Sequence, residues 1–291
     1  MTTIGFIGLG VMGEPMCRNL ARKSGLPIVA FDLRAEPLAR VATHGVRAAA
    51  STAAVVEAAD LVLLSLPGGP QVRAVCLEAG GVLEHVRRGQ LVADTSTCPV
   101  ALARELDTAF AAKGVAFADA PIARTRQAAE QGTLSIMVGA TAAVFERLKP
   151  VLSNMGSEVT HCGPVGCGQL VKLMNNMVIA ETVVALSEAI TIARRAGMDD
   201  ALLFDTMTKG SSDSFALRNH GLKSVLPGDF PENAFSARYM LKDLSYALAL
   251  ARETGVAATG AAHAAELLEA AIAGGDGDRY WPALVKVIDK A

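Results

Sequence analysis

The sequence predicts an α/β fold with two domains, a doubly wound sheet at the N-terminal end and an all-α domain at the C-terminal end. The chain has 291 residues, and roughly 150 residues per domain suggests two domains. Short β-rich runs alternate with helical runs in the first half, and no convincing strand follows Gly168. The pattern changes near residues 162–167, so we expect domains at residues 1–163 and 164–291.

The expected N-terminal strands are short and continuously apolar, and helices lie between them. Continuous apolar strands are typical of a parallel sheet that is covered on both faces. One helix spans residues 13–23 and another spans 51–59, with Ser51 or Thr52 as its N-cap. A third helix begins near Pro99. The strands are expected at residues 4–7, 28–31, 61–66, 91–93, 115–117, 133–138 and 159–161.

One long apolar helix, at residues 169–195, opens the C-terminal domain. It would extend on the order of 40 Å, at about 1.5 Å per residue. Apolar residues occupy most of its circumference, so we expect it to be buried nearly all round. Gly197 fits the C′ position behind it, and Met198-Asp199-Asp200 opens the next helix. Further helices are expected at residues 201–207, 237–254 and 257–273.

Charge and composition argue against several classes of protein. Lys and Arg number 27, Asp and Glu number 29, and aromatic residues make up 4%. That balance lacks the basic face and the stacking rings that favour nucleic-acid binding. Polar and charged residues interrupt the most apolar stretch, residues 170–193, and a lipid span tolerates them poorly. Five cysteines without an obvious secretory leader indicate a reducing compartment. We therefore expect a soluble cytoplasmic protein without a membrane or nucleic-acid partner.

A glycine-rich turn, G-x-G-x-x-G at residues 8–13, follows the first expected strand and opens a helix. Gly8 permits the tight turn, Gly10 lets a pyrophosphate approach the backbone, and Gly13 lets the helix pack on the strand. The helix N-terminus, with Val11 and Met12, would hold the phosphates. The alternative is a glycine-rich turn that binds no ligand.

Asp32 ends the second expected strand, at about the distance from the glycines that a dinucleotide site requires. A carboxylate there accepts hydrogen bonds from the ribose hydroxyls and repels a 2′-phosphate. The cofactor is therefore expected to be NAD (NADH) rather than NADP. Arg34 is the complication, because a nearby arginine accommodates the phosphate. The alternative for Asp32 is a solvated surface carboxylate.

At this point the sequence resembles the β-hydroxyacid dehydrogenases, which include 3-hydroxyisobutyrate dehydrogenase and tartronate semialdehyde reductase. The resemblance spans almost the whole chain and implies an N-terminal Rossmann domain, an all-helical C-terminal domain and an active site in the cleft between them. It rests on segments in the same order and spacing as in the family: Gly5 to Gly13 with Pro15-Met16 and Asn19-Leu20; Asp94 to Pro99; Asp119-Ala120-Pro121 with Gly132-Thr133-Leu134; Gly166-Cys167-Gly168 with Lys172 and Asn175-Asn176; and Lys242-Asp243-Leu244.

Lys172, Asn175 and Asn176 are expected to share one face of the long helix. Three such groups on an apolar helix are costly unless they meet ligands or one another. The residues alone leave a structural role across the domain interface open. The family resemblance implies that Lys172 is the catalytic general acid and base and that Asn176, with Asn175, orients the substrate oxygens. Desolvation and nearby cations would lower the pKa of Lys172 towards that task.

Other candidate residues lie in loops after the strands, where open α/β sheets bind ligands. Ser96 is expected to contact substrate and Thr97 the cofactor, although both could instead serve as N-caps ahead of Pro99. The resemblance implies that Leu66 and Pro67 contact the cofactor through their backbone. It also places Lys242 near the cofactor, where the alternative is a solvated helix lysine.

The loop at residues 121–126 departs from the family pattern. Most of the family has Ser-Gly-Gly here, and this chain has Arg124 and Thr125 at the position of the two glycines. Sulfolactaldehyde reductases within the family look similar at this loop, which implies that Arg124 grips a sulfonate. A guanidinium offers the charged planar fork that suits an oxyanion. Thr125 is expected to contact the substrate with Arg124, and Arg126 is expected to face solvent. The alternative for Arg124 is a surface-pointing side chain.

The sequence thus predicts an NAD-dependent enzyme that acts on a short anionic aldehyde or its hydroxy acid, with 3-sulfolactaldehyde as the specific substrate. The alternatives are 3-hydroxyisobutyrate or tartronate semialdehyde chemistry, an imine reductase, and a non-catalytic NAD-binding scaffold. No metal site is expected, because no Cys-x-x-Cys accompanies His161, Cys162 and Cys167. A helix that is apolar on nearly every side needs neighbours, so we expect a homodimer or homotetramer built on C-terminal helices.

Overall fold

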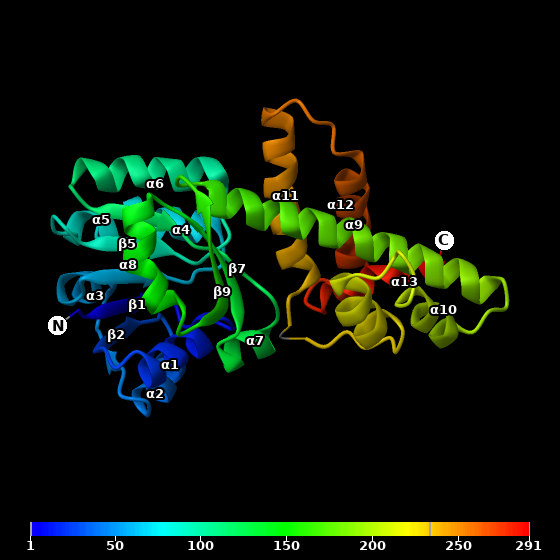
Figure 1. Cartoon of the computed structure of the whole chain (residues 1–291), viewed down its shortest axis with the longest axis horizontal. Coiled ribbons are helices and arrows are strands. Elements are labelled where there is room, and N and C mark those ends of the chain that lie inside the picture. Colours follow the sequence, from blue (N-terminus) through cyan, green and yellow to red (C-terminus); the bar gives the residue numbers. More distant parts are fainter. Residues whose placement is uncertain (1, 233, 291) are drawn as a thin grey trace. The chain divides into compact units, whose positions relative to one another are not determined.

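The computed structural model describes residues 2–232 and 234–290 (Figure 1). The chain divides into two compact units, Met1–Lys172 and Leu173–Ala291. The first unit contains the sheet and the second unit is helical. The predicted fold class, a doubly wound sheet followed by an all-α part, is therefore confirmed.

The first unit is built on one nine-stranded sheet. Its strand order is β3-β2-β1-β4-β5-β6-β8-β7, with β9 paired to β8. The run from β3 to β6 is parallel and has the strand order of a Rossmann fold. The strands are β1 Ile4–Ile7, β2 Ile28–Phe31, β3 Arg47–Ala48, β4 Leu61–Leu64, β5 Leu91–Asp94, β6 Ala116–Asp119, β7 Ile122–Ala123, β8 Leu134–Gly139 and β9 Gly156–Gly163.

The expectation of a fully parallel sheet is wrong for its last strands. β8 pairs antiparallel with both β6 and β7, and only β9 continues in parallel with β8. Residues 124–133 alone connect β7 to β8, and a parallel crossover needs a dozen or more residues. In the described residues, β6 and β8 are paired at a single position, where Asp119 lies opposite Gly139. The sheet is therefore opened between these two strands.

Helices cover both faces of the sheet, as Figure 1 shows. On β1, Phe6 belongs to one apolar core and Ile7 belongs to the other. The Ser51 hydroxyl accepts a hydrogen bond from the Ala54 amide, so the predicted N-cap at Ser51 is confirmed. The helices of this unit are α1 Gly13–Lys23, α2 Ala35–Ala42, α3 Thr52–Ala58, α4 Gly69–Leu77, α5 Val82–His85, α6 Val100–Ala112, α7 Arg126–Gln131 and α8 Ala142–Leu152.

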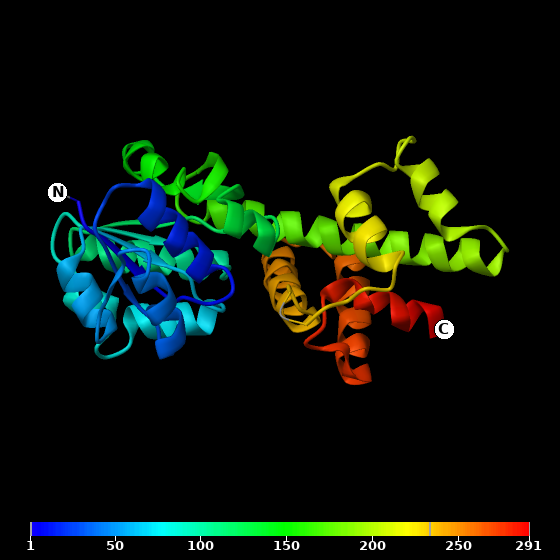
Figure 2. The same ribbon diagram turned by 90° about the horizontal axis from the view of Figure 1, so that it is seen from below.

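The second unit is helical, and its only β-pairing in the described residues is two isolated bridges (Figure 2). The long helix α9 ends as expected. Gly197 has φ +82°, and the Met198 amide bonds to the Ala193 carbonyl at 2.9 Å, the geometry of a Schellman cap. The helical segments are α9 Cys167–Arg195, α10 Asp200–Met207, the π-helix η1 Leu217–Val225, α11 Ala237–Glu253, α12 Thr259–Ala271, the π-helical η2 Ile272–Asp276, the 3-10 helix η3 Trp281–Leu284 and α13 Val285–Lys290.

The expectation that α9 is buried nearly all round is wrong for the chain taken by itself. Val171, Val178 and Ile192 are 41%, 58% and 68% exposed. By length and composition the helix could cross a membrane, and half of its most apolar 18-residue window is buried within the protein. A helix in the core of a soluble protein can have the same length and apolar composition. The described part of the chain therefore covers one side of α9 and leaves an apolar stripe exposed.

The first turn of α9 belongs to the sheet unit. A side chain at Gly168 would collide with the carbonyl of Met137 on β8. The Gln169 amide donates a hydrogen bond of 2.7 Å to the carboxylate of Asp119 on β6. The two units consequently divide after Lys172, inside α9, whereas the sequence places the boundary between residues 163 and 164.

Candidate active site

The turn between β1 and α1 has the geometry that a dinucleotide requires. Gly8 has φ +96°, and a side chain there would collide with the carbonyl of Ser65. A side chain at Gly13 would collide with the carbonyl of Gly8, so this glycine allows the helix to approach the strand. At Gly10, by contrast, no other atom of the described residues lies within 4 Å of the position that a Cβ would take. The backbone of Gly10 is thus open to a ligand.

Helix α1 begins at this turn, where the Glu14 amide donates to the Gly10 carbonyl at 3.1 Å and Pro15 has no N–H. Met12 is its N-cap residue, and no side chain of the described residues caps it. Val11 is 51% exposed. Uncapped amides at a helix N-terminus form a binding site for phosphate. A hollow of about 400 Å³ opens beside the turn, and its lining includes Gly10, Val11, Arg18 and Arg34. The turn therefore fits a dinucleotide, and the binding roles of its residues stay predictions.

Asp32 is not a solvated surface carboxylate. Its Oδ2 accepts a hydrogen bond of 2.7 Å from the Leu9 amide inside the glycine-rich turn. Its Oδ1 accepts hydrogen bonds from the amide and the Nε of Arg34, at 2.9 and 3.2 Å. Burial acts to raise the pKa of Asp32, but these hydrogen bonds and the Arg34 charge together hold it below its usual value. The carboxylate is therefore ionised at neutral pH.

Ser96 links three of the expected site segments. Its hydroxyl accepts a hydrogen bond of 2.8 Å from the Leu66 amide, which fixes the Leu66-Pro67 loop after β4. Its carbonyl accepts one of 2.8 Å from the Gln169 side chain in the first turn of α9. The N-cap interpretation of Ser96 and Thr97 is wrong, because the N-cap residue of α6 is Pro99 and no side chain of the described residues caps this helix.

Three buried residues in this network have no role in the sequence analysis. Asp94, Asp119 and Gln169 are each 0% exposed. Asp94 ends β5 and accepts hydrogen bonds from the Ser96 amide and the Cys98 thiol. Gln169 also accepts a hydrogen bond of 3.1 Å from the Cys98 amide. In the sequence, Asp94 and Asp119 stand out as carboxylates at the ends of expected strands and within the family-like segments. The residues to which Asp119 and Gln169 bond lie too far away in the chain to be inferred.

Lys172 follows Gln169 by one helical turn and is 8% exposed. Further along α9, in the helical unit, Asn176 is buried and Asn175 is exposed. The Asn175 side chain donates to the Asn176 oxygen at 3.1 Å, and Asn176 donates to the buried Asp243 carboxylate at 2.7 Å. α9 thus carries the predicted lysine and amides on consecutive turns, as their spacing predicts.

Lys242 is not a solvated helix lysine. On α11, its Nζ lies 3.0 Å from the Asp243 carboxylate in an ion pair. It also lies 5.3 Å and 5.7 Å from the ring centroids of Tyr239 and Tyr246. Cation–π contacts and the ion pair hold this ammonium in one place. Its contact with the cofactor stays a prediction.

Arg124 has a backbone conformation that arginine rarely adopts. Its φ is +86°, in the region that favours glycine. Its Nη1 donates to the Thr133 carbonyl at 2.6 Å and to the Ser157 hydroxyl at 2.9 Å. Within the described residues, its Nε and Nη2 donate no hydrogen bond. Thr125 caps α7, because its hydroxyl accepts a hydrogen bond from the Ala128 amide. Arg126 is exposed and pairs with Glu130, as expected for a solvent-facing side chain.

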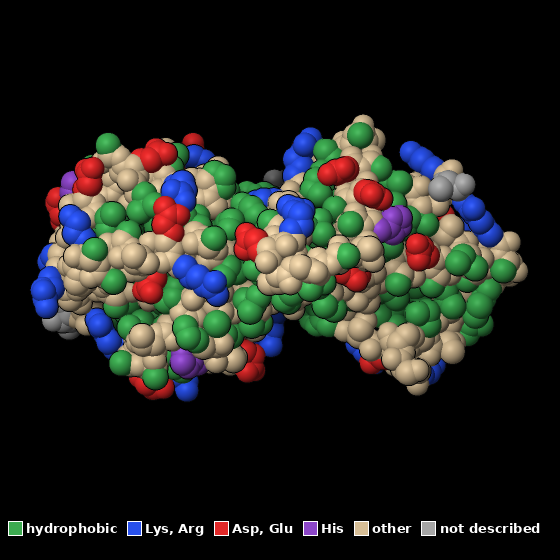
Figure 3. Space-filling view, turned by 90° about the horizontal axis from the view of Figure 1, so that it is seen from above, with side chains coloured by type: hydrophobic (Ala, Val, Ile, Leu, Met, Phe, Trp, Pro, Cys, Tyr) green, Lys and Arg blue, Asp and Glu red, His purple; other side chains and the backbone are tan. Residues whose placement is uncertain are grey.

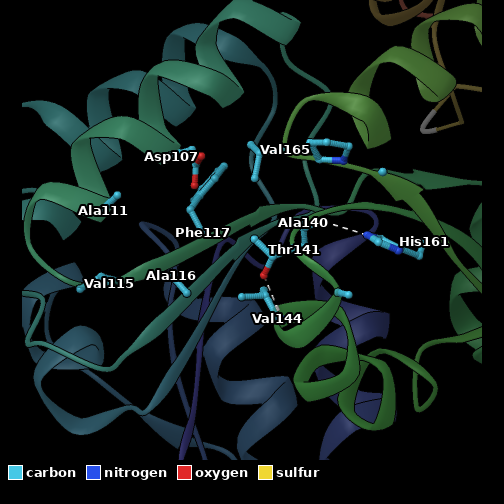
Figure 4. Close-up of a pocket in the computed structure, with 13 residues that line it drawn as sticks. Asp107, Ala111, Val115, Ala116, Phe117, Ala140, Thr141, Val144, His161 and Val165 are labelled. Carbon is cyan, nitrogen blue, oxygen red and sulfur yellow. Dashed lines mark hydrogen bonds between the residues drawn. The ribbon is translucent and has the colours of Figure 1, made fainter.

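A second hollow, of about 420 Å³, contains none of the predicted site residues. Residues of β6 and residues that follow β8 line it, and Figure 4 shows Asp107 of α6 near Phe117 and His161 of β9 beside Ala140. His161 Nε2 lies 2.8 Å from the Ala140 carbonyl. No group of three or more His, Cys, Asp or Glu residues that could hold a metal occurs in the described residues.

Charged side chains of both signs are interspersed over the face shown in Figure 3, and hydrophobic side chains gather on part of the helical unit. No broad basic field is visible on this face. The surface therefore offers nothing there that would attract a polyanion.

Comparisons with known proteins agree with this architecture. The family described as the NAD binding domain of 6-phosphogluconate dehydrogenase matches residues 3–163. The family described as NAD-binding of NADP-dependent 3-hydroxyisobutyrate dehydrogenase matches residues 166–288. Together they cover the sheet unit and the helical unit.

Similar proteins match over nearly the full chain. The 2-(hydroxymethyl)glutarate dehydrogenase of Eubacterium barkeri is 35% identical, over 98% of this chain and 94% of that protein. The 3-hydroxyisobutyrate dehydrogenase of Pseudomonas aeruginosa is 36% identical, over 87% and 86%. The solved structure of Mycobacterium tuberculosis 3-hydroxyisobutyrate dehydrogenase with L-serine is 34% identical, covers 99% of both chains and has a TM-score of 0.90. The chain therefore belongs to the β-hydroxyacid dehydrogenase family and is a nicotinamide-dependent oxidoreductase.

Proposed function

We propose that this enzyme interconverts a short anionic aldehyde and its hydroxy acid or alcohol, with Lys172 as the general acid and base. The observation that carries the proposal is the position of Lys172. It is 8% exposed and lies one turn after Gln169, whose side chain is bonded to the Ser96-Cys98 loop. The sequence position of Lys172 is therefore one helical turn from a residue bonded to a loop at the carboxyl ends of the strands, where such sheets bind ligands.

The bound nicotinamide would supply or accept the hydride. In the reduction direction, the Lys172 ammonium would polarise the substrate carbonyl and donate a proton to its oxygen. In the oxidation direction, the neutral amine would take the hydroxyl proton. Asn176 is held by Asp243 at 2.7 Å and would orient a substrate oxygen. A non-catalytic scaffold would not need a lysine buried at this position, because burying an ammonium is costly.

The proposed cofactor is NAD. Asp32 is ionised and is held by hydrogen bonds from Leu9 and Arg34, so its carboxylate has little freedom to move, and in this proposal it accepts hydrogen bonds from the ribose hydroxyls. A 2′-phosphate would be repelled there. The name of the second matching family refers to an NADP-dependent enzyme, so the argument for NAD rests on Asp32.

The proposed substrate is 3-sulfolactaldehyde, which would be reduced to 2,3-dihydroxypropane-1-sulfonate. Support comes from Arg124, whose guanidinium replaces the family's glycine backbone with a charged fork. The second candidate is 3-hydroxyisobutyrate, favoured by the names of relatives that are 34–36% identical. Tartronate semialdehyde is a further carboxylate of the same size class. The sulfonate differs from these two carboxylates in its anionic group, so the choice between sulfonate and carboxylate rests on Arg124.

A substrate panel tests the reaction and the role of Lys172. We expect NADH oxidation with 3-sulfolactaldehyde, and weaker activity with the carboxylate aldehydes. Lys172→Ala should lower kcat by about 10²- to 10⁴-fold, the usual contribution of general acid–base catalysis. NADH affinity, measured by fluorescence titration, should remain unchanged.

Lys149→Ala is the matched control, because Lys149 is an exposed lysine on α8 of the same unit. It should leave kcat unchanged. Full activity of Lys172→Ala would refute the catalytic role of Lys172. A preference for carboxylates over the sulfonate would replace the proposed substrate with 3-hydroxyisobutyrate or tartronate semialdehyde.

A further inference from the structure

Asp119 is a buried carboxylate in a space that glycines create. It ends β6, is 0% exposed and lies opposite Asp94 in the pairing of β5 with β6. A side chain at Gly139 on β8 would collide with its Oδ1, and one at Gly168 on α9 would lie 2.8 Å from its Oδ2. Two like-charged groups side by side in the interior are costly. The carboxylate must therefore have strong compensating contacts.

Those contacts are with the beginning of α9. Asp119 Oδ1 accepts a hydrogen bond of 2.6 Å from the Gly166 amide, and Oδ2 accepts one of 2.7 Å from the Gln169 amide. The first amides of a helix have no partner within the helix, and a carboxylate satisfies them with charge-assisted bonds. Because one carboxylate holds two amides that are three residues apart, it fixes the position and the direction of this first turn.

The first turn of α9 in turn controls where Lys172 lies. Lys172 follows Gln169 by three residues and so shares its side of the helix. The Gln169 side chain bonds to the Cys98 amide at 3.1 Å and to the Ser96 carbonyl at 2.8 Å. A movement of this turn would shift Lys172 relative to the Ser96 loop.

We propose that Asp119 is a positioning residue for catalysis, whose ionised carboxylate holds the first turn of α9 so that the Lys172 ammonium reaches the substrate carbonyl. The proposal rests on the proposed role of Lys172. Asp119 itself touches neither substrate nor cofactor in this account.

The pKa of Asp119 lies close to neutral pH. Burial raises its pKa to about 6 against the lowering effect of the Gly166 and Gln169 amides, and the Asp94 charge raises it further. The titratable groups that interact with it are Asp94 on β5 and the Cys162 thiol on β9, whose own pKa burial raises. Above pH 6 both Asp119 oxygens accept hydrogen bonds. As the pH falls through about 6, the carboxyl takes up a proton and loses its charge, so its hydrogen bonds from the two amides become weaker.

This titration predicts a loss of reductase activity on the acid side. Lys172 as a general acid is protonated at low pH, so its own titration lowers the reduction rate only on the alkaline side. An acid-side decrease in kcat with a midpoint near 6 is therefore assigned to Asp119.

The test compares Asp119→Asn with Asp107→Asn in the full chain, using saturating NADH and the best aldehyde of the panel. Asp107 is the matched control, because burial raises the pKa of this carboxyl as well, and Asp107 is not among the groups that shift the pKa of Asp119. We expect kcat at pH 7.5 to fall by about 10- to 100-fold in Asp119→Asn, the effect of a small displacement of a catalytic group. KM for NADH should not change. The acid-side decrease should disappear in Asp119→Asn and persist in Asp107→Asn.

A second measurement is independent of activity. In the wild-type chain, the NMR chemical shifts of the Gly166 and Gln169 amides should titrate with a midpoint near 6. If Asp119→Asn fails to fold, this titration still decides the question, and its absence overturns the proposal. A wild-type pH profile and rate in Asp119→Asn would also overturn it. Full activity of Lys172→Ala, by contrast, would refute the proposed function while leaving the amide titration unaffected.

Discussion

Arg124 occupies a backbone position that suits glycine, and this makes it the most informative single residue in the chain. Its φ of +86° places an L side chain in a left-handed region, at a cost of roughly 1–2 kcal/mol. Two hydrogen bonds from its guanidinium, to the Thr133 carbonyl and the Ser157 hydroxyl, offset part of this cost. Strained residues of this kind cluster at functional sites. We infer that the loop kept the glycine-like conformation when it acquired a charged side chain.

Substitutions at Arg124 separate recognition of the anion from strain. Arg124→Ala should lower kcat/KM for a sulfonate or carboxylate aldehyde by about 30-fold to several thousandfold, because a charge-assisted pair is lost. Arg124→Lys should recover only part of the activity, since an ammonium cannot form the bidentate fork. Arg124→Gly should lose as much activity as Arg124→Ala and should be more stable than it by about 1 kcal/mol, because glycine adopts this φ freely. Kinetics and thermal unfolding measure the two effects.

An uncharged aldehyde of similar size is the control substrate for this series. Its kcat/KM should change little in any of the variants. If Arg124→Ala slows charged and neutral substrates equally, the residue shapes the loop and does not bind the anion, and the sulfonate proposal loses its main support.

The sequence could predict those residues whose neighbours are close in the chain. The glycines of the turn and Asp32 lie within one βαβ unit, so their spacing is enough to place them. Asp119 and Gln169 could not be assigned in this way, because Asp119 bonds to residues 47 and 50 positions away and Gln169 to one 73 positions away. Their function depends on contacts that only the folded sheet and helix bring together.

The β1–α1–β2 element combines the glycine turn with the group that selects the cofactor. Asp32 supports the turn through the Leu9 amide, and Arg34 reaches back to the Leu9 carbonyl at 3.2 Å. The carboxylate is therefore part of the turn itself. A change at Asp32 should alter cofactor choice and also loosen the turn.

We expect the wild-type enzyme to prefer NADH over NADPH by at least about tenfold in kcat/KM, because about 1.4 kcal/mol of repulsion is enough for that factor. Asp32→Asn removes the carboxylate charge and keeps the shape of the side chain, so it should lower the ratio of kcat/KM for NADH to that for NADPH. Arg34→Ala should weaken any residual use of NADPH, and it serves as the companion variant. Steady-state rates with both cofactors measure the ratio. Equal kcat/KM values for NADH and NADPH in the wild type would disprove the role assigned to Asp32.

At the level of elements, periodicity predicted most strands and the longer helices α1, α9, α11 and α12 within a few residues of their bounds, but it missed the helices α2, α4, α5, α7 and α8. It could not predict the reversal at β8, because strand direction depends on the length of the connection and on pairing partners. It also could not predict which part of α9 is covered. Apolar residues surround that helix, and only the packed neighbours determine which of them are buried.

The exposed side of α9 has a regular pattern that concerns the molecule as a whole. Val171, Val178, Ala185 and Ile192 recur every seven residues, and all four are exposed. A seven-residue apolar repeat keeps one stripe in line when two helices coil around each other. Exposed apolar stripes on a soluble protein mark interaction surfaces. We therefore predict that α9 pairs with a second copy of the chain.

Sedimentation velocity at micromolar concentration should show a dimer or tetramer. The double variant Val178→Glu with Ile192→Glu should dissociate it, because two pairs of buried, unpaired carboxylates would weaken association by at least about 2–5 kcal/mol. Val256→Glu is the matched control, since Val256 and Val178 are equally exposed, at 58%, and Val256 lies outside α9. It should leave the assembly intact. Circular dichroism should show unchanged helix content in both variants. A monodisperse wild-type monomer would contradict this prediction, because the apolar stripe on α9 would then be exposed to solvent and not paired with a second copy of the chain.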